Sequence, residues 1–152
     1  MEESTFFGLS CQVFAGSRVK LKGNAKSEIS RMKGEIQGFL TNKNGLILLA
    51  CLGGVTGSSM TAPIAETAKA LNIPVLVIVS LPFDFEGKKR MDEAMKGLES
   101  IEQLGITIAS FSNQQLMGIA GKDTTLEDAF QLVDVEVWKV LKPYFAGEKV
   151  IV

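Results

Sequence analysis

The stretch from Gly45 to Ser59 constrains the fold more than any other part of the sequence. Its residues 46–51 form an unbroken apolar run, which is typical of a strand buried on both faces of a parallel sheet. Glycines and hydroxyl residues follow, and a helical pattern runs from about Ser59 to Leu71. Because glycines allow close backbone approach and a helix start presents free N–H groups, this order predicts a phosphate-binding loop. A simple tight turn is the alternative interpretation.

Composition narrows the class of protein. The 152 residues are 46% apolar, which favours one globular domain spanning 1–152. A net charge of −1 without a basic run argues against nucleic acid or an anionic membrane as a partner, and no apolar stretch approaches the ~20 residues of a membrane span. The acidic start lacks the features of a signal peptide, so we expect a cytoplasmic protein with Cys11 and Cys51 reduced and buried. The absence of histidine excludes a histidine base or ligand, and no metal site is predicted.

Apolar runs alternate with helical patterns along the chain. We expect strands at 5–14, 45–51, 75–79 and 106–109, helices at about 27–42, 59–71, 88–104, 113–119 and 125–144, and a short strand or ordered tail at 149–152. Ser27 and a capping box at 124–127 would begin two of the helices, and Pro63 would lie in or near a first helical turn. This alternation predicts an α/β fold, a three-layer sandwich with a mainly parallel sheet. Ligands of such sheets bind at the carboxyl ends of strands, here in loops 52–59, 81–87 and 110–115.

Four segments together resemble one family. Residues 53–59, GGVTGSS, resemble the glycine-rich signature of the tubulin/FtsZ family, and 82–91, PFDFEGKKRM, is similar almost letter for letter to an FtsZ segment. Asn113 stands where FtsZ has Pro-Asn-Asp, and 124–130 resembles the start of the long central FtsZ helix. The similarity runs in order from about Ser27 to Leu141. The chain is therefore identified as a divergent member with an incomplete, Rossmann-like GTPase domain.

The resemblance implies a guanine-nucleotide site for GTP or GDP, with Mg²⁺ if a triphosphate binds. The phosphates would face Gly53, Gly54, Thr56, Gly57 and Ser58; the ribose would contact Glu86 and Arg90; Asn113 would bond the sugar or base; Phe130 would stack on guanine; and Asp134 would accept from its N–H groups. Phe130 and Asp134 are four residues apart and share a helix face. Each role has a plainer alternative. Residues 53–58 would form only a tight turn, Glu86 and Arg90 a local salt bridge, and Asn113 a turn. Phe130 would be a core aromatic residue and Asp134 a solvated acid.

The sequence also departs from the family. The family's first strand and first phosphate loop are not visible, so the strand at 45–51 would have an exposed hydrogen-bonding edge. Residues 5–14, residues 149–152 or a second copy of the chain would have to cover it. The second phosphate loop of the family aligns with 23–27, where most glycines are gone, and Val55, Cys51 and Ser59 replace glycines around the main loop. We expect Val55 to resist a positive φ and to crowd a phosphate.

Three possible functions follow from these similarities to the family and departures from it. The first is a guanine-nucleotide-binding domain that binds weakly and is deficient in GTP hydrolysis, because the family's acidic catalytic loop is not visible; no catalytic residue is assigned. The second is an interaction or dimerisation module without nucleotide, as a homodimer or with an FtsZ-like partner. The third is a GTPase completed by another chain. A role in cell division is implied by analogy alone.

Overall fold

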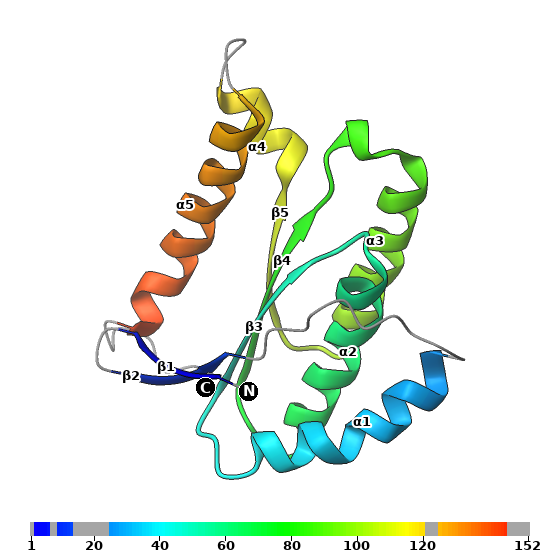
Figure 1. Ribbon diagram of the computed structural model, residues 1–152, viewed down its shortest axis with the longest axis vertical. Helices are drawn as coiled ribbons and strands as arrows, with labels where there is room; N and C mark the ends of the chain where they lie inside the picture. The colour runs from blue at the N-terminus through cyan, green and yellow to red at the C-terminus, as the bar shows by residue number, and fades with distance from the viewer. Residues whose placement is uncertain (1, 7–8, 14–24, 121–124, 146–152) are drawn as a thin grey trace.

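A parallel sheet of three strands forms the centre of the computed structural model, which describes residues 2–6, 9–13, 25–120 and 125–145 (Figure 1). The strands are β3 (Leu46–Cys51), β4 (Val75–Leu81) and β5 (Thr107–Ser112), in the order β3-β4-β5. Leu46 pairs with Val75, and Leu76 pairs with Thr107. Residues Val75 to Ser80 of β4 are buried because the strand lies between two neighbours and between two layers of helices. The predicted parallel pairing is confirmed.

Helices cover both faces of this sheet. Helices α1 (Ala25–Leu40), α2 (Val55–Ala70) and α3 (Lys88–Glu102) pack on one face, where their side chains surround Val75, Val77 and Val79. Helix α5 (Leu126–Phe145) packs on the other face through Leu141 against Leu76 and Ile78 (Figure 1). A turn of 3-10 helix, η1 (Asp84–Glu86), precedes α3, and α4 (Asn113–Ala120) follows β5. The predicted three-layer α/β sandwich is confirmed.

The amino-terminal segment differs from its predicted single strand. Strands β1 (Glu2–Phe6) and β2 (Leu9–Val13) pair antiparallel, with Glu2 opposite Val13, as a two-stranded sheet of their own. The prediction of one strand over 5–14 is therefore wrong, and these strands do not extend the central sheet. A hairpin satisfies its backbone groups within the segment, so it needs no place beside β3.

Helix starts are the least accurate part of the sequence prediction. Helix α2 begins at Val55, so Pro63 lies inside it rather than near its first turn. Helix α1 already begins at Ala25, so Ser27 does not cap it. The capping box before α5 is displaced by one residue, because Thr125 and Asp128 exchange the hydrogen bonds expected of Thr124 and Glu127. Three-letter cap patterns recur at neighbouring positions, and propensity alone does not choose between them.

The outer edge of β3 is open in the described part of the chain. There β3 pairs with β4 alone, and the Leu49 side chain is 56% exposed. Cys51 is exposed too, so the prediction of a buried cysteine is wrong at this position. The predicted strand or tail at 149–152 lies outside the described residues, as does the side chain of Cys11. None of the described helices has the length and apolar character needed to cross a membrane.

Candidate nucleotide site

The loop after β3 is built for close backbone approach. Gly53 has a φ of 99°, a conformation that glycine adopts without strain. A Cβ atom on Gly57 would lie 2.0 Å from the Cys51 carbonyl oxygen, so only glycine lets the start of α2 lie this close to the end of β3. Gly54 is the N-cap residue of α2 and provides no side-chain cap. The N–H groups of the first helical turn therefore point out of the helix start without a capping side chain, as an anion requires.

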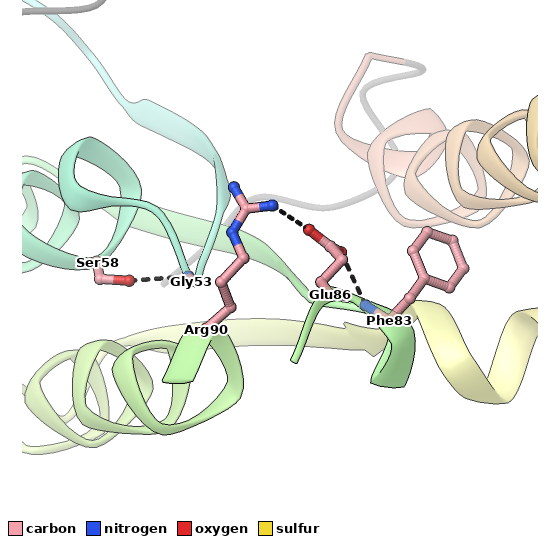
Figure 2. Close-up of polar contacts among 5 residues, drawn as sticks. All are labelled: Gly53, Ser58, Phe83, Glu86 and Arg90. Carbon is pink, nitrogen blue, oxygen red and sulfur yellow. Dashed lines mark hydrogen bonds and ion pairs between the residues drawn. The ribbon is translucent and has the colours of Figure 1, made fainter. Parts of the chain in front are cut away.

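Val55 does not strain this loop, contrary to the expectation from its sequence. It is the first residue of α2, and the positive φ of this loop belongs to Gly53. The Val55 side chain is 68% exposed, so it projects from the helix start rather than into the protein. Ser58 turns inward instead, and its Oγ accepts the Gly53 N–H at 2.9 Å (Figure 2). The Ser58 side chain thus bridges the two ends of the loop. Because the Gly53 N–H already donates to Ser58, it is not available to a ligand unless this bond breaks.

Glu86 and Arg90 form one unit beside this loop. One Glu86 carboxylate oxygen accepts the Phe83 N–H at 2.9 Å, and the other pairs with the Arg90 guanidinium, as Figure 2 shows. A Cβ on Gly53 would lie 3.0 Å from the Arg90 carbonyl oxygen, so the start of α3 touches the loop. The Arg90 side chain is 54% exposed. The local salt bridge considered as an alternative is thus present, and it still leaves a cation accessible next to the helix start of α2.

Asn113 is the most unusual polar residue of the region. It begins α4 at the carboxyl end of β5 and is only 6% exposed, yet its Oδ1 has no hydrogen-bond donor among the described residues. An unsatisfied buried acceptor costs about 1–3 kcal/mol. The neighbouring Gln114 accepts the Asp84 N–H through Oε1 at 3.2 Å, which ties α4 to η1. Sequence reasoning missed Gln114, because a glutamine after a strand carries no distinctive pattern.

Helix α5 carries the two residues expected to recognise the base. Asp134 is an exposed carboxylate, and within the described residues it forms no hydrogen bond or ion pair. The side chain of Phe130 lies outside the described part, so its stacking role stays a prediction. The structure thus brings together the loops at 53–58, 82–90 and 113–114, at the edge of the sheet predicted to bind ligands. It leaves the contribution of α5 untested.

An exposed aromatic residue also belongs to this edge. Phe85 lies in η1 and is largely exposed, and its ring stacks on the buried Phe83 ring with centroids 5.0 Å apart. Phe83 anchors the turn in the protein, so Phe85 and the Glu86–Arg90 pair keep a fixed position. The alternation of aromatic and acidic residues at 83–86 was the available signal for this arrangement.

Known proteins are similar to this chain in sequence and in fold. The Tubulin/FtsZ family, GTPase domain, matches residues 9–121. Cell division protein FtsZ of Rickettsia felis is 41% identical over 100 residues, which cover 66% of this chain and 22% of that protein. Its counterpart in Aquifex aeolicus is 32% identical over 108 residues, covering 71% of this chain and 29% of that protein. The alignments therefore span less than a third of these relatives.

Solved structures agree with the sequence comparison. The empty FtsZ dimer of M. jannaschii superposes with a TM-score of 0.68 at 28% identity, over 79% of this chain and 35% of that chain. CetZ of Methanosaeta thermophila superposes with a TM-score of 0.65 at 19% identity, over 80% of this chain and 35% of that chain, which shows the shared fold. Because the family match covers well over half of its residues, this chain belongs to the tubulin/FtsZ family and carries part of the GTPase domain.

Proposed function

We propose that this chain binds a guanine nucleotide at the carboxyl edge of its sheet, weakly, and that alone it is deficient in GTP hydrolysis. The observation that carries the proposal is the buried Oδ1 of Asn113, which lacks a donor among the described residues. A ribose hydroxyl or a base N–H would supply that donor and remove the cost of burying the oxygen. The ligand would be GDP or GTP, with Mg²⁺ accompanying a triphosphate.

Different residues at this edge would contact different parts of the nucleotide. The uncapped first turn of α2 presents N–H groups to the phosphates, with Thr56 and Gly57 in that turn. Arg90 lies beside this turn and adds a positive charge. Asp134 would accept from the N1–H and N2 amino group of guanine, a pair of donors that adenine does not have. The proposed selectivity therefore depends on α5, and the proposed phosphate contacts depend on α2 and α3.

Weak binding follows from bonds that already exist at this edge. The Gly53 N–H donates to Ser58, and both oxygens of Glu86 have partners. A nucleotide would have to exchange these bonds for its own, so it would gain less free energy than at a site with open donors. Residues 52–58 also contain no lysine or arginine, which leaves the phosphate charge to Arg90 and the helix start.

Isothermal titration calorimetry with GDP, GTP and ATP tests the proposal. We expect heat with GDP and GTP and none with ATP. Arg90→Ala should weaken GDP binding by about tenfold or more, since it removes a charge-assisted contact. The matched control is Lys89→Ala, which removes the neighbouring exposed charge and should leave the affinity unchanged. An absence of heat at millimolar GDP would reject nucleotide binding.

The base contact has its own test. Asp134→Ala should reduce the preference for GDP over ADP, because the carboxylate is the proposed acceptor for guanine. Gln131→Ala removes another exposed polar side chain of α5 and serves as the control. If Asp134→Ala binds both nucleotides like the parent chain, Asp134 is a solvated acid and not a recognition residue.

Contact with another protein is a second candidate function, favoured by the exposed Leu49 and by the edge of β3, which no other described strand covers. The partner would be a second copy or an FtsZ-like chain, and hydrolysis would then require residues from that chain. Light scattering tests whether a second copy is the partner, and a monomer at high concentration would count against it.

Steady phosphate release from GTP by the purified chain would contradict the proposed deficiency in GTP hydrolysis. A cytoplasmic location and a role in cell division extend the proposal by analogy with the relatives.

A further inference from the structure

The turn between α1 and β3 contains an asparagine followed by a glycine. Asn44 and Gly45 are both exposed, and they lie between the end of α1 and the first residue of β3. Figure 1 shows this turn at the end of the sheet opposite to η1 and α4, so it is remote from the proposed nucleotide site. Asn-Gly pairs favour turns. The same pair is chemically reactive, because glycine has no side chain to shield its backbone nitrogen from the asparagine side chain.

The reacting groups of this pair have no partner in the described part of the chain. There the Gly45 N–H donates no hydrogen bond, and the Asn44 side chain forms none either. The residues on either side are anchored. The Lys43 N–H donates to the last residue of α1 at 3.1 Å, and the Leu46 N–H donates to the Pro74 carbonyl at 2.8 Å. Fixed flanks therefore hold a pair whose own amide groups are free to react with each other.

Two other exposed asparagines lack this arrangement. Asn42 is followed by Lys43, and Asn72 is followed by Ile73. The N–H groups of Lys43 and Ile73 donate to backbone carbonyls at 3.1 and 3.0 Å. Both residues also carry side chains that hinder attack by their nitrogens, and the side chain of Ile73 is buried and β-branched. Of these three described asparagines, Asn44 alone adjoins a nitrogen that is neither bonded nor shielded.

We propose that Asn44 is a site of spontaneous deamidation. The Gly45 nitrogen attacks Cγ of Asn44, so that an N–Cγ bond forms and the bond from Cγ to Nδ2 breaks. Ammonia leaves with the proton of the Gly45 amide, and a cyclic succinimide remains. Water then opens the ring at the side-chain carbonyl to give aspartate, or at the backbone carbonyl to give isoaspartate. Water is the co-reactant, and no group is oxidised or reduced.

The product carries a new negative charge and, as isoaspartate, a longer backbone before β3. Strand β3 is held from Leu46 to Cys51 by its register with β4, so the added length stays within residues 43–45. These residues are exposed and can shift without disturbing the core. The new carboxylate adjoins Lys43, whose ammonium group lies 5.7 Å from the centroid of the Phe39 ring. The chain should therefore stay folded while its isoelectric point falls.

Peptide mapping by mass spectrometry tests the assignment on the intact, folded chain. During incubation at neutral pH and a temperature below unfolding, the peptide that contains Asn44 should gain the mass of an amide-to-acid conversion. Fragment masses should place the change at Asn44 and leave Asn42 and Asn72 as amides. Isoaspartyl methyltransferase, which methylates isoaspartate, should label the same peptide. A sample digested before incubation corrects for conversion during digestion.

Gly45→Ala tests the attacking nitrogen. It should slow the conversion by about tenfold or more, because the new methyl group hinders close approach of the side chain to the backbone. The variant should fold, since its Cβ would meet only the Pro74 carbonyl oxygen, at 3.9 Å. Gly38→Ala is the matched control. Its Cβ meets nothing within 4 Å, and it should convert at the rate of the parent chain.

Two outcomes would overturn the assignment. If Asn44 remains an amide in the folded chain while the urea-unfolded chain converts, the fold protects it. If Gly45→Ala and the parent chain convert at equal rates, the Gly45 nitrogen is not the attacking group. Neither outcome bears on nucleotide binding, because the proposed ligand contacts lie at the carboxyl end of the sheet and Asn44 precedes its first strand.

Discussion

Asn113 links stability and binding through one oxygen atom. Replacing Asn113 with leucine, which has nearly the same size, removes a buried acceptor that lacks a donor among the described residues. The free energy of unfolding should stay level or rise by up to about 1–3 kcal/mol, because the cost of burying that oxygen disappears. The affinity for GDP should fall at the same time. Urea unfolding and calorimetry measure the two effects.

Gln115→Leu is the control for Asn113, since it alters an exposed residue of the same helix. It should leave GDP affinity as it is. If Asn113→Leu loses stability and affinity together, Asn113 is a structural residue whose donor lies in the part of the chain not described.

Gly57 is required by packing rather than by a positive φ. In Gly57→Ala the new Cβ would meet the Cys51 carbonyl oxygen at 2.0 Å, and a backbone carbonyl at the end of a strand cannot yield easily. We expect a loss of about 2 kcal/mol or more in the free energy of unfolding, measured by urea denaturation. Gly38→Ala is the matched control, because its Cβ meets nothing within 4 Å on helix α1, and it should stabilise by about 0.5–1 kcal/mol. Equal effects of the two substitutions would refute this packing argument.

At the scale of elements, the start of α5 depends on one capping pair. The Thr125 hydroxyl donates to Asp128 Oδ2 at 2.6 Å and accepts the Asp128 N–H at 3.2 Å. The hydroxyl bond, followed by the bond from the Thr125 N–H, lowers the pKa of Asp128. Because the pKa is lowered in the folded state, the cap stabilises the fold fully at pH values above the ordinary aspartate pKa of about 3.9. This stability is lost as the pH falls through the lowered pKa of Asp128.

Thr125→Val should therefore return the pKa of Asp128 toward its ordinary value and weaken the acid-sensitive part of α5 stability. An NMR titration of the Asp128 carboxyl carbon measures the shift. Thr41→Val removes a hydroxyl that donates to the Gln37 carbonyl at the end of α1, so it should not move the Asp128 pKa. An unchanged Asp128 pKa in Thr125→Val would show that the cap is not formed in solution.

Elements were predictable from sequence where one physical signal dominated. The apolar runs 46–51 and 75–79 exclude most alternatives to buried strands, and both strands lie where expected. The start of α2 was misplaced by four residues because the glycines suggested a longer turn, whereas Gly57 serves close packing inside the helix. Strands β1 and β2 were predicted as one strand because the sequence between them carries no strong turn signature. The ion pair of Glu86 with Arg90 is a local i,i+4 contact, and the sequence offered it as an alternative to ribose binding. The orphaned oxygen of Asn113 depends on tertiary packing, which no local pattern encodes.

At the scale of the molecule, the two faces of the sheet differ in how many apolar side chains they bury among the described residues. Among the side chains that the structure describes, the face under α1, α2 and α3 holds the larger buried cluster, and the face under α5 holds a smaller one around Leu76, Ile78 and Leu141. Burial of apolar area supplies most of the stability that resists local opening. The layer formed by α4 and α5 should therefore separate from the sheet at lower free energy than the layer formed by α2 and α3.

Native-state hydrogen exchange at low urea concentrations measures that order, and nucleotide should change it. Without ligand, amides of α5 should exchange through a smaller opening than amides of β4 and α2. If Asp134 holds the base while α2 holds the phosphates, GDP connects the two layers, and saturation at 100 times Kd should slow the α5 opening by about a hundredfold. GDP that protects 53–58 without slowing α5 would confine binding to the phosphate side. Slower exchange in α5 than in α2 without ligand would mean that the smaller cluster is not the weaker layer.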